Sequence, residues 1–265
     1  MRPQKQTNTR YGNMVYFLDD PTIGQSLELY GEYCHDEIWW MKTLTNPESF
    51  VLDIGANIGT HTIGISPYVK RVMAFEPDPD NFDLLVKNVS ITMCRNVTPA
   101  PAAASDVLGK VGTQFDYGKT SLIPSGDIPA TPIDMIQELP RIDFVKIDVE
   151  GMELKVLNGM RQTIASYKPQ MLIEMQDENV YAKTYDFLNG FGYNIYWLPV
   201  RTYTEHNHKN NTEDVFGAQH GVINWIASTI QLNTTLQAVV DRDDTVERMV
   251  WRRSQNVGYD RKNGG

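Results

Sequence analysis

Acidic side chains follow two apolar segments where strands of a buried parallel sheet would present them to a ligand. Asp148, Glu150 and Glu153 come just after the apolar run 142–147, and Glu174 ends the next such run. A carboxylate in this place can remove or share the proton of a reacting hydroxyl. The alternative is that these acids favour the positive N-terminus of the following helix, and one residue can do both. We predict Asp148 as the base or orienting group, with Glu150 in support.

A lysine and a late histidine lie near this predicted site. Lys146 precedes Asp148 by two residues and shares its side of the strand, where a buried ammonium needs an acidic partner. We therefore expect a structural ion pair. His220 opens a late apolar run across the sheet from Asp148, and we predict a supporting catalytic role, with a loop histidine as the alternative. Cys34 and Cys94 are isolated and show no metal-ligand spacing, so no metal site is predicted.

A glycine-containing turn, VLDIGANIGTHT, joins the first strong strand candidate to a helix. Gly55 and Gly59 permit a tight turn and a close approach of the backbone to a ligand. A dinucleotide-binding turn would read GxGxxG, but Asn57 occupies the third position of that pattern. Asp53 precedes the first glycine by two residues, where it would face a phosphate. His61 follows the turn, where a helix-capping role is expected and contact with the ligand is the alternative.

The next strand candidate ends in Glu76, and an acid in this place can accept hydrogen bonds from both hydroxyls of a ribose. Together Asp53 and Glu76 favour a ligand with a ribose, an amino-acid end and no phosphate. S-adenosyl-L-methionine meets these conditions, so we predict it as the cofactor and S-adenosyl-L-homocysteine as its product. The alternative is a tight turn without a ligand.

These residues need a scaffold in which strands alternate with helices. Apolar, β-branched runs predict strands at 50–54, 70–75, 96–103, 142–147, 170–174, 193–198 and 221–227. A weakly alternating stretch at 111–124, around Tyr117-Gly118, predicts a hairpin. Apolar strands that alternate with helical segments predict an α/β fold, a parallel sheet covered on both faces.

Three helices follow from caps and periodicity. Asp78 can cap a helix whose first residue is Pro79. Its expected apolar face is Phe82, Leu85, Val86 and Val89. A second helix is expected to carry Val156, Leu157, Met160 and Ile164 on one face. A third runs through Tyr181 and Tyr185 and ends near Gly190.

The chain reads as one core with additions at both ends. We predict an N-terminal cover over 1–49, a core over 50–227 and a C-terminal extension over 228–265 that is partly disordered. The strand and the helix expected in the cover span residues 14–18 and 36–44. A long polar loop over 198–216 is expected to set acceptor choice, because long loops in compact domains are often functional.

Composition excludes several classes of protein. The chain has 265 residues, 41% apolar residues and a net charge of −9, as in an ordinary globular protein and unlike a disordered one. An acidic chain lacks the footprint of a nucleic-acid binder, so no nucleic-acid partner is expected. The arginine cluster Arg248, Arg252, Arg253 and Arg261 is interpreted as a solvated tail. Without a signal peptide or a run of about 18 apolar residues, the chain is expected to be cytoplasmic, with no membrane span.

The segments VLDIGANIGTHT, FEPDPDNFDLLVKNV, AAASD and FVKIDVEGMELKVLNGM together resemble the FkbM family of S-adenosylmethionine-dependent methyltransferases, over roughly residues 15–227. The resemblance implies the Rossmann-like class I methyltransferase fold: a mostly parallel seven-stranded sheet with helices on both faces, a reversed last strand and a hairpin inserted before the fourth strand. It implies that the methionine end of the cofactor lies along Asp53, Gly55, Asn57, Gly59 and Thr62. It further implies that Glu76 holds the ribose and that the adenine lies along Asp78, Ser105 and Asp106.

The expected activity is therefore methyl transfer, by in-line displacement, to a hydroxyl of a small molecule or sugar. Asp148 is the predicted base or orienting group, supported by Glu150 and His220. An amine or peptide acceptor is one alternative, and a non-catalytic nucleotide-binding module is another. A nicotinamide-dependent oxidoreductase is disfavoured by Asp53 and Asn57. The sequence does not indicate the identity of the acceptor or the oligomeric state.

Overall fold

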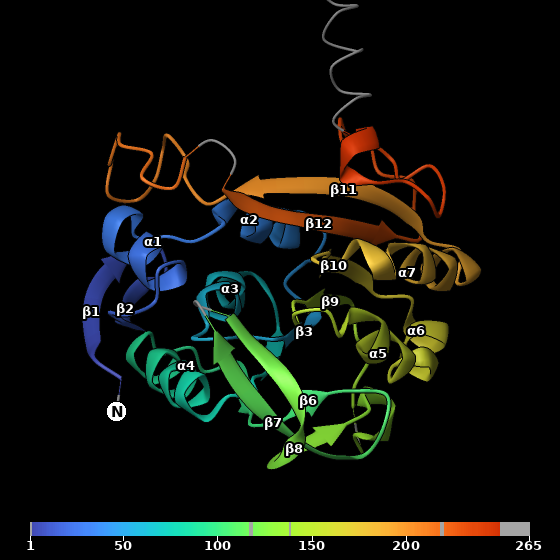
Figure 1. The fold of residues 1–265 in the computed structure, drawn as a ribbon, viewed down its shortest axis with the longest axis horizontal. Helices are drawn as coiled ribbons and strands as arrows, with labels where there is room; N and C mark the ends of the chain where they lie inside the picture. Colours follow the sequence, from blue (N-terminus) through green and yellow to red (C-terminus); the bar gives the residue numbers. More distant parts are fainter. Residues whose placement is uncertain (1, 117–118, 138, 218–219, 250–265) are drawn as a thin grey trace, which may run out of the picture.

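The computed structural model describes residues 2–116, 119–137, 139–217 and 220–249, with a seven-stranded sheet at its centre (Figure 1). In chain order the strands are β3 (Phe50–Ile54), β4 (Arg71–Phe75), β5 (Val97–Ala100), β9 (Phe144–Ile147), β10 (Gln170–Glu174), β11 (Asn194–Arg201) and β12 (Gly221–Ser228). Every residue of β3 and β9 is buried, as expected for apolar strands covered on both faces.

The strand order places a topological reversal at β3. The strands pair in the order β11-β12-β10-β9-β3-β4-β5. Neighbours from β10 to β5 are parallel, whereas β12 is antiparallel to both β10 and β11. Ligands of open sheets bind beyond the carboxyl ends of the strands at such a reversal. The predicted Rossmann-like sheet with a reversed last strand is confirmed.

Helices cover both faces of this sheet. They are α1 (Ile23–Tyr30), α2 (His35–Thr43), α3 (Thr60–Ile65), α4 (Pro79–Ile91), α5 (Glu153–Asn158), α6 (Arg161–Tyr167) and α7 (Glu178–Gly190), with 3₁₀ turns at Ser66–Tyr68 and Ile133–Met135. Helices α5 to α7 pack with Leu52 and Ile54 of β3, whereas α2 and α3 pack with Val51, which points to the opposite face. Among the described residues, no helix combines the length and apolar character that crossing a bilayer requires.

Helix α4 begins where predicted but buries a different set of side chains. Asp78 Oδ1 accepts a hydrogen bond from the Asn81 N–H at 3.0 Å, and Pro79 is the first helical residue. The expected apolar face included Val86, which is 42% exposed. The buried residues are Asn81, Leu84, Leu85 and Asn88. Asn88 belongs to this set because its amide bonds to the backbone of neighbouring segments, which a hydrophobic pattern cannot show.

The single helix predicted after β9 is two helices, α5 and α6, with a break at Gly159. The predicted apolar residues Val156, Leu157, Met160 and Ile164 are all fully buried. A Cβ at Gly159 would lie 1.9 Å from the carbonyl oxygen of Ser105. We attribute the break to this close passage of two backbone segments.

The predicted hairpin before the fourth core strand is present. Strands β7 (Gly109–Asp116) and β8 (Lys119–Thr131) pair with each other, and β8 also pairs with β6 (Ala103–Ala104). The strand predicted over 96–103 therefore stops at Ala100, because the chain then leaves the central sheet to join the hairpin. The predicted centre of the turn, Tyr117-Gly118, lies outside the described residues.

The N-terminal segment contains the predicted strand and the predicted helix, together with two elements, β1 and α1, that were not predicted. Strand β2 (Gly12–Phe17) and helix α2 match the expected strand and helix to within two residues. Strand β1 (Gln4–Thr9), with the sequence QKQTNT, is polar and mostly exposed and so shows no alternation. It pairs antiparallel with β2, whose residues 14–17 are buried against the rest of the molecule.

Asn88 joins β2 to the turn after β3, and its replacement with alanine should destabilise the fold. Its Oδ1 accepts from the Val15 N–H at 2.7 Å, and its Nδ2 donates to the Val15 and Ile58 carbonyls, both at 2.9 Å. Asn88→Ala would leave buried backbone groups unpaired, so we expect a loss of about 3 kcal/mol in chemical unfolding. Ser90→Ala on the exposed side of α4 is the matched control. Equal stability of the two variants would contradict this role.

The described part of the C-terminal extension packs along β11. The Trp197 N–H donates to the Gln237 carbonyl at 2.8 Å, and the Trp197 indole donates to Asp244 Oδ2 at 3.1 Å. Residues 229–249 therefore continue the core. Residues 250–265, which hold Arg252, Arg253 and Arg261 of the predicted arginine cluster, lie outside the described residues.

Candidate active site

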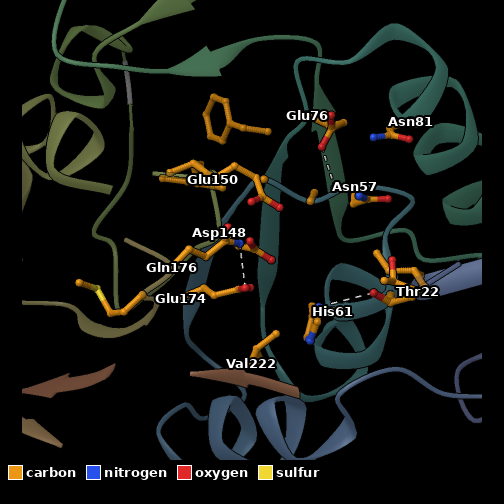
Figure 2. Close-up of a pocket in the computed structure, with 18 of the residues that line it drawn as sticks. Thr22, Asn57, His61, Glu76, Asn81, Asp148, Glu150, Glu174, Gln176 and Val222 are labelled. Atoms are coloured by element: carbon orange, nitrogen blue, oxygen red, sulfur yellow. Dashed lines mark hydrogen bonds between the residues drawn. The ribbon is translucent and has the colours of Figure 1, made fainter. Parts of the chain in front are cut away.

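A cavity of about 540 Å³ opens at the carboxyl ends of four neighbouring strands (Figure 2). The residue directly after each of β3, β4, β9 and β10 lines it, namely Gly55, Glu76, Asp148 and Met175. Its volume is within the roughly 300–1,000 Å³ typical of small-molecule sites. The cavity therefore lies at the edge of the sheet where acidic residues were predicted, and it is large enough for a small-molecule ligand.

The turn after β3 carries backbone to the wall of the cavity. Gly55 has a φ of 87°, and a Cβ on this residue would lie 1.7 Å from the Asp148 carbonyl oxygen. The N–H groups of Gly55 and Ala56 both donate to the Phe75 carbonyl, at 3.0 and 2.9 Å. Asn57 has a φ of 51°, a conformation that asparagine tolerates better than most residues. The turn therefore keeps its shape with asparagine, and not glycine, at position 57.

Glu76 is held over this turn by two backbone donors. Its Oε2 accepts from the Asn57 N–H at 2.7 Å, and its Oε1 accepts from the Asp78 N–H at 2.9 Å. Burial raises the pKa of Glu76 to about 8 despite these hydrogen bonds. The Asn81 side chain also hydrogen-bonds to this carboxylate, whose two oxygens have further acceptor capacity for the hydroxyls of a diol.

Asp148 shares the cavity with two ionisable neighbours. Lys146 Nζ lies 2.9 Å from Asp148 Oδ2 and the lysine side chain is 1% exposed, which confirms the expected ion pair. Burial acts against the charged form of Asp148, but the Lys146 ammonium and a hydrogen bond with Glu174 lower its pKa. Burial and the Asp148 carboxylate raise the pKa of Glu174 well above its usual range. At neutral pH Glu174 is therefore protonated and donates to ionised Asp148.

Gln176 completes this arrangement from the other side of Glu174. Its Nε2 donates to Glu174 Oε1 at 2.9 Å (Figure 2). The Glu174 carboxyl group is thus held between an amide donor and a carboxylate acceptor. This places one neutral and one charged carboxyl group side by side at the cavity.

The two other predicted acids occupy different places. Glu150, with a φ of 50°, lines the cavity. Glu153 is fully buried in the first turn of α5 and accepts the Gly151 N–H at 2.8 Å. Burial raises the pKa of Glu153. The helix-capping alternative therefore describes Glu153, whereas Glu150 faces the ligand space.

His220 is an exposed residue that also lines the cavity. Its Nδ1 lies 3.0 Å from Thr202 Oγ1, and its ring centroid lies 4.8 Å from that of Phe216. The histidine is therefore held by the long loop before β12.

The residues predicted to hold the cofactor fall into two groups. Gly55, Asn57 and Glu76 line the cavity. Asp53, Gly59, Thr62, Asp78, Ser105 and Asp106 do not. Asp53 and Thr62 are fully buried, and the Thr62 hydroxyl donates a hydrogen bond to Asp53 Oδ2 at 2.5 Å. The contact of this second group with a ligand stays a prediction.

Several lining residues come from segments without a recognisable motif. They are Thr22, Ile23 and Tyr33 of the N-terminal segment, and Gln176, Tyr181 and Val222, whereas Asn81 of α4 lies within the segment FEPDPDNFDLLVKNV but was not predicted as a site residue. His61, for which helix capping was expected, also lines the cavity and makes no capping hydrogen bond. Only Gln176 gave a signal in the sequence, because it follows the end of a strand by two residues.

The lining of the cavity is acidic. Five carboxyl groups face it, from Glu76, Asp148, Glu150, Glu174 and Glu178, and two of them, Glu76 and Glu174, have raised pKa values and are protonated at neutral pH. No lysine or arginine is found among the lining residues that the structure describes. Such a surface repels phosphate and attracts cations. The residues present therefore fit a phosphate-free ligand that carries a positive charge and a diol.

The loop before β12 folds back on the N-terminal segment, beside α1 in Figure 1, and leads into His220 at the rim of the cavity. Buried Glu32 accepts hydrogen bonds from Arg10 Nε at 2.6 Å, from Thr204 Oγ1 at 2.8 Å and from the His208 N–H at 3.0 Å. The loop and the first segment of the chain are thus joined through one carboxylate. Because His220 follows this loop and Tyr33 follows Glu32, both parts contribute to the cavity.

Comparison with known proteins identifies similar chains. A sequence model of the methyltransferase FkbM domain matches residues 53–195, more than half of the chain. The hexuronic acid methyltransferase AglP of Haloferax volcanii is 30% identical over 49% of this chain and 63% of that protein. The methyltransferase sdnD of Sordaria araneosa is 26% identical over 50% of this chain and 66% of that protein. The chain thus spans slightly less than two thirds of the length of these two relatives.

Among solved structures, the methyltransferase FkbM from Methylobacillus flagellatus KT is similar in fold. The TM-score is 0.51 at 20% identity, over 75% of this chain and 48% of that chain. At this identity the likeness concerns the fold alone, and it agrees with the sheet described above.

Proposed function

The chain belongs to the FkbM family of methyltransferases, and on this premise we propose that it transfers a methyl group from S-adenosylmethionine to a hydroxyl oxygen of a small molecule or a sugar. The observation that carries the proposal is the acid-lined cavity with Glu76 fixed over the glycine turn. S-adenosylmethionine supplies a methyl group on a positively charged sulfur. Its ribose, its ammonium and its lack of phosphate suit the charge of the lining.

In this proposal Glu76 accepts hydrogen bonds from both ribose hydroxyls of the cofactor. The backbone around Gly55 and Asn57 borders the amino-acid end of the cofactor. Asp53, Gly59 and Thr62 support the turn from behind, and the adenine lies toward Asp78, Ser105 and Asp106. The raised pKa of Glu76 has a consequence for binding, since hydroxyl donors favour the ionised carboxylate.

For the transfer itself, the acceptor oxygen must lie in line with the methyl group and the sulfur. Asp148 is the proposed orienting group, because Lys146 and Glu174 hold its carboxylate in the ionised state. Glu150 is proposed to contact the acceptor in support, and His220 to contact it from the rim. An ionised carboxylate can hold the hydroxyl by accepting its hydrogen bond, without keeping the proton.

The charge of the cavity narrows the acceptor class. AglP is named for a hexuronic acid, which is an anion at neutral pH. The ionised Asp148 would repel such a substrate, and no lysine or arginine among the described lining residues would pair with it, so an uncharged sugar or small alcohol is the proposed acceptor. The same observation favours an amine as the second candidate, because an ammonium group would be attracted.

The experiment that tests the function is calorimetric titration with S-adenosylhomocysteine beside NAD. We expect micromolar binding of the first and none of the second. The methyl glycosides of glucose, glucosamine and glucuronic acid then serve as acceptors, with S-adenosylhomocysteine formation as the readout. Binding of neither cofactor would contradict the proposal, and a preference for the glucuronide would contradict the argument from charge.

Cofactor affinity is expected to rise with pH, because Glu76 is protonated below about pH 8 in the free protein. Ribose hydroxyls favour its ionised form, so binding below that pH releases a proton. The dissociation constant for S-adenosylhomocysteine should therefore fall as pH rises from about 6 to 8, by at most about tenfold per pH unit, and then level off. Calorimetry of Glu76→Gln, which cannot ionise, should show weaker binding without this slope. An equal slope in both proteins would refute the role of Glu76.

A further inference from the structure

A buried histidine and glutamate form a pair at the wall of the cavity. His61 Nε2 lies 3.1 Å from Glu37 Oε2, and the two side chains are 8% and 2% exposed. Glu37 comes from α2, ahead of residues 53–195 that the family model matches, and His61 from the first turn of α3. The two atoms are close enough for an ion pair but are not aligned as a hydrogen bond. A small rotation of the ring would align them.

Glu37 is itself fixed in place. Its second oxygen, Oε1, accepts a hydrogen bond from Asn224 Nδ2 at 3.2 Å. Asn224 belongs to β12, so Glu37 is held between α2 and the central sheet. Its free oxygen is therefore directed at His61, and a carboxylate beside one imidazole nitrogen favours the N–H on that nitrogen.

The other nitrogen of His61 is the one that can react. His61 lines the cavity, where Figure 2 shows it among the labelled side chains. Its Nδ1 lies 3.5 Å from Thr60 Oγ1, a long contact, and the Tyr33 ring packs edge-on against the imidazole with centroids 6.2 Å apart. With the proton on Nε2, Nδ1 carries a lone pair that can accept a proton.

Asp148 is poorly suited to keep a proton taken from a hydroxyl. Lys146 and Glu174 stabilise its charged form and lower its pKa. A useful base has a pKa near the working pH, which an imidazole meets in water and a stabilised carboxylate does not. Asp148 can orient the acceptor, and another group must remove the proton.

Resting on the proposed function, we propose that His61 is the general base of methyl transfer and that Glu37 is the positioning residue that holds its imidazole. The acceptor O–H proton moves to His61 Nδ1 as the oxygen–methyl bond forms. The methyl–sulfur bond breaks, and its electron pair stays on sulfur. The imidazolium then lies beside the Glu37 carboxylate and later returns the proton to solvent.

The charges around the site favour this step. Four carboxyl groups, from Glu37, Asp53, Asp148 and Glu174, act on a single buried ammonium, that of Lys146. Positive charge on His61 would therefore face an excess of carboxylates. A carboxylate beside a catalytic histidine stabilises the imidazolium cation that forms during the reaction.

Two measurements test the proposal. The first is the rate of S-adenosylhomocysteine formation with the methyl glycosides named above. His61→Ala should lower kcat by about 10²- to 10⁴-fold, and added imidazole should restore about tenfold of the loss. Glu37→Gln should lower kcat by about tenfold or more at unchanged KM. Ser90→Ala, on the exposed side of α4 and outside the cavity lining, should match the wild type.

The second measurement needs no acceptor. Diethyl pyrocarbonate should modify His61, as read by peptide mass spectrometry, and S-adenosylhomocysteine should protect it. A His61→Ala enzyme with wild-type kcat, or a loss that imidazole does not restore, would overturn the proposal. If no glycoside is methylated, the modification experiment decides. The proposal is then overturned if diethyl pyrocarbonate does not modify His61, or if S-adenosylhomocysteine does not protect His61 from modification. Failure of the wild type to bind S-adenosylhomocysteine would instead refute the proposed function itself.

Discussion

Replacing Asp148 with asparagine is expected to lower the rate of methyl transfer by about 10²-fold or more while changing cofactor affinity only a few-fold. The carboxylate proposed to orient the acceptor is lost, but the negative charge in this part of the cavity is not. Glu174 stays protonated in the wild type partly because of the Asp148 carboxylate. In the variant it can ionise and take over as the partner of Lys146. Steady-state rates and calorimetry with S-adenosylhomocysteine measure the two effects.

A double variant separates orientation from stability. Asp148→Asn with Glu174→Gln leaves the buried Lys146 ammonium without either neighbour and should cost about 3–5 kcal/mol in chemical unfolding. The single variant should lose much less stability than this. If Asp148→Asn alone abolished binding of S-adenosylhomocysteine, Asp148 would be a cofactor-binding or structural residue and the orienting role would be wrong.

Replacing Gly55 with alanine should destabilise the protein by about 3–5 kcal/mol and remove cofactor binding. Two causes add. The φ of 87° is unfavourable for any residue with a Cβ, and that Cβ would lie 1.7 Å from the Asp148 carbonyl oxygen. This is a backbone atom at the end of a buried strand and cannot move aside. The ends of β3 and β9 would have to separate, and the turn below Glu76 would shift with them.

Gly151 provides the matched control for this variant. It also has a positive φ, 89°, but no atom lies within 4 Å of the place where its Cβ would be. Gly151→Ala should therefore show only the conformational cost, about 1–2 kcal/mol. Chemical unfolding of both variants measures the difference. Equal losses would mean that the contact with Asp148 contributes nothing and that φ alone explains the requirement for glycine.

The parts of the fold that the sequence predicted are those set by local pattern. Strands such as β3 and β9 are mainly apolar runs with one charged residue each, and α4 has its cap and proline in the expected places. The elements that were missed depend on distant contacts. The break at Gly159 arises from the Ser105 backbone, and the burial of Asn88 arises from Val15. Ser105 and Val15 are both far from their partners in the sequence, so a pattern of neighbouring residues cannot reveal these contacts.

The same distinction holds for the candidate site. Strand ends predicted the positions of Glu76, Asp148 and Glu174, because the residue types and the direction of the chain suffice for that. The pairing of His61 with Glu37 could not be predicted, because it requires α2 to lie against α3. Local reasoning assigned His61 a capping role that its side chain does not fill.

The carboxylate of Glu32 joins parts of the chain that a ribosome delivers at different times. Its partner His208 follows 176 residues later. At roughly 5–20 residues per second, that interval takes about 10 to 35 s to synthesise. The strands β3, β4 and β9 are complete before the loop exists, whereas the rim cannot close until the loop emerges. A nascent chain therefore acquires the segments around the glycine turn well before it can enclose the acceptor side of the cavity.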